Sequence, residues 1–385
     1  MLKKLPVFIV QTLAVLVLTM VFGEVYVRAF HKVDDITPAL LKERSLDYEP
    51  SVFARHVFPQ KEQAVTHRGW LAANTPREYR INALGYRGVD FSADKPKGTV
   101  RIMIYGGSHV FDPGASNGED WPSRIEQAFH TDGRKDVHVI NAGIPGHASF
   151  DSAGRYLAEG HHFQPDYVIL NNAWNDIKRL YSENYLLRDI KPLKPESNPL
   201  LSYQNPVDRL LGGISLFYVW LRQGYLFKKH DIRMEGAAQK LTSIATEPTA
   251  LALTQYELTL QTFVDTVRNT GGVPILMIQP RLFYQSQRDT EEDQRYYEQR
   301  LKENTGMYPR QYILNCFAQL DDITRRVAAA KHVALIDPNE ALRERPGERL
   351  FRDHVHLDLE GSRRLGRFMK EELTKIMAAP AGGRP

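Results

Sequence analysis

Two short motifs carry the side chains that a serine-based reaction requires. A Gly-Gly-Ser turn ends at Ser108 and follows the apolar, β-branched run 100–105, which indicates a buried strand. A serine on a glycine-rich turn after such a strand is exposed where α/β sheets keep their active sites. Near the C-terminus, Asp353 and His356 stand three residues apart, and they could supply an orienting carboxylate and a base. Together the motifs predict a serine hydrolase.

Each of these residues also has a purely structural interpretation. Ser108 alone would be a turn serine in most proteins, and Asp353 with His356 could form a surface pair on a loop. His354 is a second candidate for the base, but the three-residue spacing favours His356. The joint occurrence of the motifs, each after a predicted strand, favours a catalytic site.

The elements that must position these residues alternate between strands and helices, which predicts an α/β fold with a parallel, doubly wound sheet. One helix should begin at Asp120, which can cap the apolar pattern that follows it. Another should stop at Gly271-Gly272. Five apolar runs predict the strands: 100–105, 137–140, 167–170, 273–278 and 333–336.

Two further strand ends carry groups suited to an oxyanion. The loop after the second strand contains Gly146, and glycine lets backbone N–H groups approach an anion closely. The loop after the third strand carries Asn175, followed by Asp176, although an Asn-Asp pair alone more often caps a helix. Ester hydrolysis through a tetrahedral intermediate needs such donors beside a nucleophile and an acid–base pair.

These four blocks resemble those of the SGNH hydrolase superfamily, also called GDSL-type esterases, over roughly 99–377. The resemblance implies a three-layer α/β/α fold, no cofactor and no metal. It implies that His356 deprotonates Ser108 while Asp353 holds the imidazole. It also implies that an oxyanion hole is formed by the backbone N–H groups of Ser108 and Gly146 and by the side-chain amide of Asn175.

Three positions depart from the superfamily pattern. Gly107 stands where Gly-Asp-Ser-Leu members carry an aspartate, and His109 follows the nucleophile. Ala173 replaces the glycine of the Gly-x-Asn-Asp block. None of these changes removes a catalytic atom, so they bear on subfamily and substrate rather than on the chemistry.

Composition excludes several other classes. The net charge is +4 from 50 basic and 46 acidic residues, and no basic tract predicts nucleic-acid binding. Cys316 is the single cysteine, so neither an internal disulfide nor a thiolate metal cluster can form. His147 and the pair His161-His162 lack a carboxylate at a recognisable ligand spacing, which favours loop or solvent roles over a metal site.

The N-terminal residues predict that the protein is attached to a membrane. Lys3 and Lys4 precede an apolar run from Leu5 to Phe22, which is long for the core of a signal peptide. No clean cleavage site follows, so we expect an uncleaved, single-pass anchor over 5–23. The two lysines keep residues 1–4 in the cytoplasm and place the remainder outside it, in the periplasm of a Gram-negative host.

The rest of the chain has three expected parts: a juxtamembrane lead-in 24–97, a catalytic domain 98–378 with insertions about 180–250 and 281–312, and a disordered tail 379–385. Within the lead-in, 80–88 should pack on the domain and cap an edge. The apolar patch 214–221 is a lid or membrane-interface helix, with packing on the domain favoured. The second insertion should be a substrate-shaping loop.

Three functions follow. The leading one is a membrane-anchored esterase that removes acyl groups, with acetyl favoured, from an exported glycan or lipid. The second is an O-acyltransferase that uses the same triad, with a sugar hydroxyl as acceptor and a membrane-bound acyltransferase as partner. The third is a non-catalytic binding protein on a hydrolase fold, and it ranks last because no triad residue is missing.

Overall fold

We describe the protein from a computed structural model of the full chain. The structure describes residues 5–30, 49, 51–68, 76–177, 180, 210–211, 214–218, 220–222, 247–282, 290–304 and 310–378. The predictions for 1–4, for the tail 379–385 and for most of the insertion 180–250 lie outside these residues. The chain divides into an N-terminal unit (Met1–Asp47, Thr66–Arg77, Lys194–Gly236) and an α/β unit (Tyr48–Val65, Glu78–Leu193, Ala237–Pro385).

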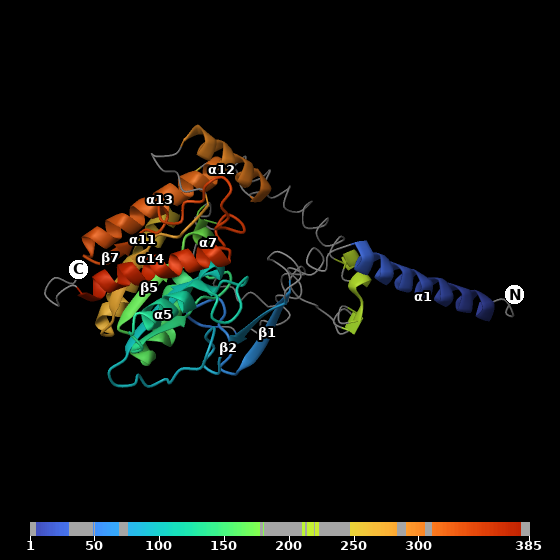
Figure 1. The fold of residues 1–385 in the computed structure, drawn as a ribbon, viewed down its shortest axis with the longest axis horizontal. Helices are drawn as coiled ribbons and strands as arrows, with labels where there is room; N and C mark the ends of the chain where they lie inside the picture. Colours follow the sequence, from blue (N-terminus) through green and yellow to red (C-terminus); the bar gives the residue numbers. More distant parts are fainter. Residues whose placement is uncertain are drawn as a thin grey trace. The chain divides into compact units, whose positions relative to one another are not determined.

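A five-stranded parallel sheet forms the centre of the α/β unit (Figure 1). Its strand order is β4-β3-β5-β6-β7, and each strand contains most of one predicted apolar run. The predicted α/β fold with a parallel sheet is therefore confirmed. The strands are β3 (Val100–Gly106), β4 (Val137–Asn141), β5 (Tyr167–Asn171), β6 (Val273–Met277) and β7 (Ala334–Ile336).

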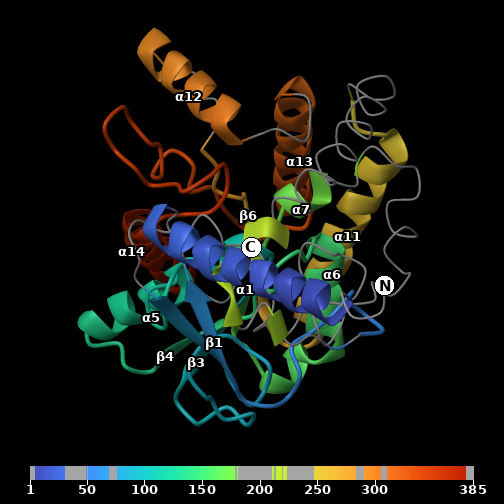
Figure 2. The same ribbon diagram turned by 90° about the vertical axis from the view of Figure 1, so that its right-hand side faces the viewer.

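Helices cover both faces of the sheet, which gives three layers (Figure 2). Alternate side chains of β3 enter different cores, because successive residues of a strand point to opposite faces. Ile102 and Ile104 belong to the core beneath α5 and α14, whereas Met103 and Tyr105 belong to the core beneath α6, α11 and α13. These helices are α5 (Trp121–Thr131), α14 (Leu359–Ala378), α6 (Ser149–Ala158), α11 (Ala250–Asn269) and α13 (Arg310–Ala330).

The helix ends follow local chemistry. The carboxylate of Asp120 accepts a hydrogen bond from the backbone N–H of Ser123 at 3.2 Å, so α5 begins where the sequence predicts it. Thr249 caps α11 in the same way through the N–H of Ala252 at 3.2 Å. Just beyond the end of α11, Gly271 has a φ of 88°, which glycine adopts readily and which stops the helix.

The segment 80–88 packs as predicted. Arg87 bridges to Asn141 of β4, the edge strand of the sheet, and Tyr86 beside it is fully buried. The Arg87 guanidinium donates to four backbone carbonyls, those of Phe111 at 2.5 Å, Asp112 at 2.7 Å, Ala115 at 2.7 Å and Ser116 at 3.3 Å. Upstream, β1 (Gln63–Arg68) and β2 (Pro76–Ile81) form a two-stranded sheet.

The second insertion is not simply the loop that we expected. Residues Glu291–Asn304 form the helix α12, whose sequence is mainly charged residues, glutamine and tyrosine. The hydroxyl of Tyr297 donates to the backbone carbonyl of Glu344 at 2.8 Å, which ties α12 to the chain beyond β7. Glutamate, glutamine and arginine are good helix formers, so this helix forms without a regular apolar face.

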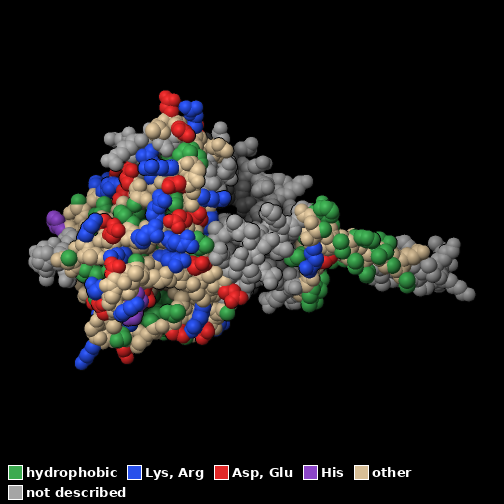
Figure 3. Space-filling view, viewed as in Figure 1, with side chains coloured by type: hydrophobic (Ala, Val, Ile, Leu, Met, Phe, Trp, Pro, Cys, Tyr) green, Lys and Arg blue, Asp and Glu red, His purple; other side chains and the backbone are tan. Residues whose placement is uncertain are grey.

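The helix α1 (Leu5–Phe30) extends beyond the predicted anchor 5–23. Its stretch Val10–Phe30 is long and apolar enough to cross a membrane. An ion pair of 2.7 Å between Arg28 and Glu24, one turn apart, supports its last turn. Hydrophobic side chains are exposed along α1, whereas Lys, Arg, Asp and Glu are interspersed over the visible face of the α/β unit (Figure 3).

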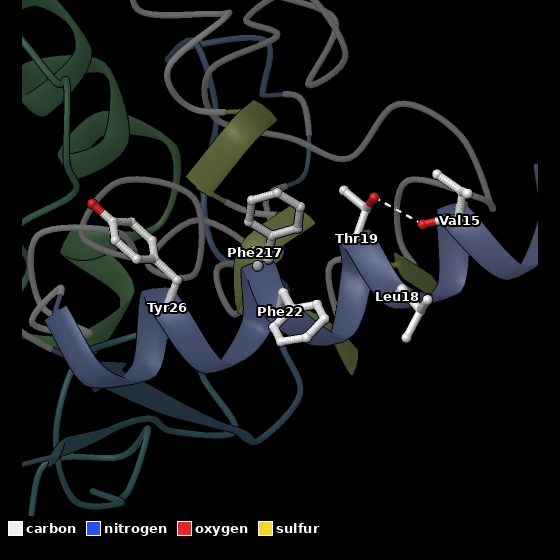
Figure 4. Close-up of a pocket in the computed structure, with 7 residues that line it drawn as sticks. Val15, Leu18, Thr19, Phe22, Tyr26 and Phe217 are labelled. Atoms are coloured by element: carbon white, nitrogen blue, oxygen red, sulfur yellow. Dashed lines mark hydrogen bonds between the residues drawn. The ribbon is translucent and has the colours of Figure 1, made fainter.

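The described residues of the apolar patch pack on α1. The Phe217 ring lies against the backbone at Gly23 (Figure 4). The Glu24 carboxylate accepts from the Ser215 hydroxyl at 3.0 Å and from the N–H of Phe217 at 3.0 Å. We expected packing on the catalytic domain, whereas these contacts lie within the N-terminal unit. A groove beside the contact is lined by Val15, Leu18, Thr19, Phe22, Gly23, Tyr26 and Phe217.

Candidate active site

The predicted site residues lie at the carboxyl ends of β3, β4 and β5 and on the loop between β7 and α14. The chain leaves β3 toward β4 but leaves β5 in the opposite direction, toward β6, so adjacent loops diverge at this point of the sheet. Ser108 begins the short helix α4 (Ser108–Phe111) directly after β3. Asn175 lies in α7 (Trp174–Ile177), shortly after β5.

The structure brings Ser108, His356 and Asp353 into one hydrogen-bonded chain. The Nε2 atom of His356 lies 2.8 Å from the Ser108 Oγ, and its Nδ1 atom lies 2.7 Å from Asp353 Oδ2. The other carboxylate oxygen of Asp353 accepts the backbone N–H groups of Val355 and His356, each at 2.9 Å. These side chains are partly exposed, 17 % for His356 and 14 % for Asp353, so a substrate can reach them.

The surroundings of Asp353 keep its carboxylate ionised. Burial by itself would raise the pKa of Asp353. The charge of His356 and its hydrogen bond, together with the N–H of Val355, outweigh burial and hold the pKa well below its usual range. An ionised carboxylate on Nδ1 fixes the tautomer in which Nε2 can accept the serine proton.

His354 does not occupy the position of the base. Its ring packs edge-on against Trp174, with ring centroids 3.9 Å apart. Its backbone carbonyl accepts the N–H of Leu282 at 3.0 Å. Of the two histidines that the sequence offered, His356 is the one in contact with Ser108.

The three residues predicted for the oxyanion hole lie on neighbouring loops. Gly146 has a φ of 85°, a left-handed conformation that favours glycine. The side-chain amide of Asn175 donates to the carbonyl of His147 at 2.9 Å, which joins the loops after β4 and β5. A Cβ atom on Gly107, next to Ser108, would lie 2.5 Å from the Asn175 Nδ2 and 2.9 Å from the His147 carbonyl.

The structure explains two of the departures from the superfamily pattern, Gly107 and His109. The space beside Gly107 is filled by the Asn175 amide, so this position has no room for the usual aspartate without a local shift. His109 is buried, and its Nε2–H donates to the Asn171 carbonyl at 2.9 Å, which ties α4 to the end of β5. Burial, together with repulsion from His356, lowers the pKa of His109 to about 3, so its ring is neutral.

A buried ion pair that we did not predict joins the segment of Ser108 to the segment of His356. Arg352 and Asp112 meet at 2.7 Å, and each side chain is only 3 % exposed. The Asp112 backbone N–H donates to the Ser108 carbonyl at 2.8 Å, and the Arg352 N–H donates to the His356 carbonyl at 2.8 Å. Ser362 of α14 donates to the second Asp112 oxygen at 2.9 Å. The only sequence signal was that Arg352 directly precedes Asp353.

Asp176 links the loop after β5 to α6. It is fully buried, and it accepts the Ser149 backbone N–H and the Ser149 hydroxyl, both at 3.1 Å. This contact satisfies an N–H group at the start of α6, the capping role that an Asn-Asp pair commonly has. Asp176 therefore positions the neighbouring Asn175, and the pair serves both structure and site.

The remaining candidates for chemistry lie elsewhere. Cys316 is buried in α13, and burial raises the pKa of its thiol to about 12. Within the described parts of the chain, no group of three or more His, Cys, Asp or Glu side chains could hold a metal ion. The hydrogen-bonded chain of Ser108, His356 and Asp353 is thus suited to acyl transfer through a serine ester.

Comparison with known proteins agrees with this chemistry. The profile of the GDSL-like Lipase/Acylhydrolase family matches residues 104–364, which include the end of β3, all of β4 and β5 and the Asp353–His356 loop. The chain belongs to this family. It is therefore an ester-hydrolysing enzyme, and its five-stranded parallel sheet is typical of SGNH hydrolases.

Solved structures also match the chain, at low sequence identity. A lipase/acylhydrolase from Enterococcus faecalis is 16% identical over 72% of this chain and 96% of its own, with a TM-score of 0.41. An acetylxylan esterase from Geobacillus stearothermophilus is 13% identical over 72% of this chain and 96% of its own, with a TM-score of 0.40. A search of curated proteins found no match.

Proposed function

We propose that this GDSL-family enzyme is a membrane-anchored serine esterase that removes acyl groups, with acetyl favoured, from an exported glycan or lipid. The observation that carries the proposal is the hydrogen-bonded chain from Ser108 through His356 to Asp353. Each ring nitrogen of His356 has one partner at hydrogen-bond distance, as a base and its orienting acid require.

The mechanism follows from these contacts. Asp353 accepts the Nδ1–H of His356, so the Nε2 lone pair faces the Ser108 hydroxyl. As Oγ attacks the ester carbonyl, Nε2 takes the hydroxyl proton, and His356 then returns that proton to the leaving alkoxide. Water, activated by the same nitrogen, attacks the acyl-serine, and the acid departs as Oγ regains its proton.

The oxyanion forms at two tetrahedral stages of this reaction. We assign its stabilisation to the backbone N–H groups of Ser108 and Gly146 and to the Asn175 amide. A left-handed Gly146 and an amide that contacts the Gly146–His147 turn support this assignment. Each donor of this kind contributes about 10²–10³-fold to kcat in a well-characterised serine hydrolase.

The proposed cellular location of the enzyme depends on α1. We propose that it is an uncleaved anchor and that the catalytic domain, 98–378, works outside the cytoplasm close to a membrane. Exposed apolar side chains along Val10–Phe30 support this, because a helix that is apolar all round is suited to lipid. Retention of the full chain in membranes after alkaline carbonate extraction tests the anchor, and release into the supernatant would refute it.

The catalytic assignment is tested with p-nitrophenyl acetate and the full chain in detergent. Ser108→Ala and His356→Ala should each lower kcat by more than about 10³-fold, because the triad acts as a unit. Ser92→Ala, at an exposed position of the lead-in, is the matched control and should retain the parent rate. Turnover at the parent rate in Ser108→Ala would refute the serine mechanism.

A further inference from the structure

A short stretch of the lead-in, 51–58, lies against the loop that carries Gly146. Its residues Ala54 and Phe58 are buried. The Phe53 carbonyl lies so close to Gly154 of α6 that no Cβ atom would fit between them. This stretch was predicted only as part of a polar lead-in, yet it packs on the α/β unit with backbone-to-backbone contact.

His56 contacts both neighbours of Gly146. Its Nε2–H donates to the Pro145 carbonyl at 3.2 Å, and its own backbone carbonyl accepts the Nε2–H of His147 at 2.6 Å. The His147 carbonyl in turn accepts the Asn175 amide at 2.9 Å. The hydrogen bonds therefore run from Pro145 through His56 and His147 to Asn175 and enclose the left-handed Gly146.

The neighbouring Arg55 fixes this stretch to the start of α6. Its backbone N–H and its Nε–H donate to the two carboxylate oxygens of Asp151, at 3.0 and 3.1 Å. Asp151 also accepts the backbone N–H of Ala148, at 2.9 Å, directly after the Gly146 turn. The Asp151 side chain is 2 % exposed, so this anchor is shielded from solvent and from salt screening.

We propose that His56 is a positioning residue for the oxyanion hole, an inference that rests on the proposed function. It holds the Pro145–His147 turn so that the Gly146 N–H and the Asn175 amide face the acyl oxygen. Catalysis by such donors depends on their being fixed before the reaction, and a displacement of about 1 Å can cost about 10²-fold in rate. A neutral ring suits this role, and burial beside Arg55 lowers the pKa of His56 to about 4.

Two variants of similar size separate the hydrogen bond from the packing. His56→Met fills the space without an N–H donor, whereas His56→Gln keeps a donor at comparable reach. With p-nitrophenyl acetate and the full chain in detergent, His56→Met should lower kcat by about 10–100-fold while KM changes less than about threefold. His56→Gln should restore kcat to within about threefold of the parent.

His130 provides a matched control. Its Nε2 lies 2.9 Å from the carbonyl of Val137, a ring-to-backbone contact of the same kind, between α5 and β4. His130→Met should lower the midpoint of urea unfolding by a similar amount but leave kcat at the parent value. A kcat for His56→Met within twofold of the parent, or an equal loss in His130→Met, would overturn the proposal.

A double-variant cycle shows whether His56 acts through the oxyanion donors. Combining His56→Met with Asn175→Ala should cost less in kcat than the product of the two single losses, because both disturb one hole. A loss of kcat in the double variant equal to the product of the two single losses would overturn the proposal. If Ser108→Ala were as active as the parent, the proposed function itself would fail. If only the His56 variants matched the parent, that function would stand without the positioning role.

Discussion

Position 107 shows how one missing side chain can shape a site. Because Gly107 has no Cβ atom, the Asn175 amide can approach the backbone next to Ser108. Its φ of −86° is accessible to any residue, so backbone freedom does not explain the glycine. The close approach of the Asn175 amide does explain it, so the glycine serves the packing beside Ser108 and, in the proposed mechanism, the oxyanion hole.

Gly107→Ala should lower kcat for p-nitrophenyl acetate by about 10–100-fold, because the added methyl group displaces the Asn175 amide. Gly133→Ala is the control. Gly133 has a φ of 84° with open space around its Cβ position, so alanine there strains the backbone and leaves the site intact. A Gly107→Ala enzyme with the parent kcat would contradict this account of the position.

The sequence predicted the triad because each member has a local signal. Ser108 follows a strand on a glycine turn, and Asp353 and His356 share one short motif. His56 and Arg352 carry no such signal. His56 acts through contacts with a turn 89 residues away. Arg352 is buried, whereas an arginine is expected at the surface when only its residue type is known.

At the scale of elements, the Arg352–Asp112 pair joins α4 to the loop before α14. Both partners are buried, so removing one leaves an uncompensated charge in the interior, which costs about 3–5 kcal/mol. We expect Asp112→Ala to lower the free energy of unfolding by about that amount, measured by urea titration. Asp112→Ala combined with Arg352→Met should recover part of the loss, because the orphaned charge is then gone.

The exposed pair of Asp132 and Lys370 is the control for this experiment. It also connects α14 to the end of α5, but the Asp132 side chain is 54 % exposed. Asp132→Ala should lower the free energy of unfolding by less than about 1 kcal/mol. Equal decreases in the free energy of unfolding for Asp112→Ala and Asp132→Ala would show that burial does not govern the contribution of these ion pairs to stability.

The sheet was more predictable than the helices around it. Its strands are continuous apolar runs, a pattern typical of parallel strands that are buried on both faces. The helix α12 lacks a regular apolar face, so periodicity could not reveal it. The end of α1 was placed too early because the apolar run stops at Phe22, whereas the helix continues through polar residues to Phe30.

Over the whole molecule, two buried histidines, His109 and His147, and the half-buried His56 couple folding to pH. Burial is the main reason that the pKa values of His56, His109 and His147 are lowered, to about 4 for His56 and about 3 for His109. These rings stay neutral in the folded chain, while the unfolded chain takes up protons below about pH 6.5. The unfolded state then binds more protons, so stability falls as the pH falls.

We expect the free energy of unfolding to decrease as the pH falls from about 6.5 to 4, by about 1.4 kcal/mol per pH unit for each of His56 and His109, and His147 contributes in the same direction. Below about pH 4 the folded chain also protonates His56, and that contribution stops growing. Urea titrations followed by tryptophan fluorescence across this range measure the slope. His109→Gln should reduce the slope by one histidine's share.

The distance along the chain between Ser108 and His356, 248 residues, has a consequence for biogenesis. Synthesis delivers the nucleophile early, but its base lies on the last loop before α14, the helix that packs beside α5. A chain whose synthesis has not yet reached His356 therefore lacks the proposed proton acceptor for Ser108. Esterase activity should accordingly appear only after the C-terminal loop has been made and has folded beside Ser108.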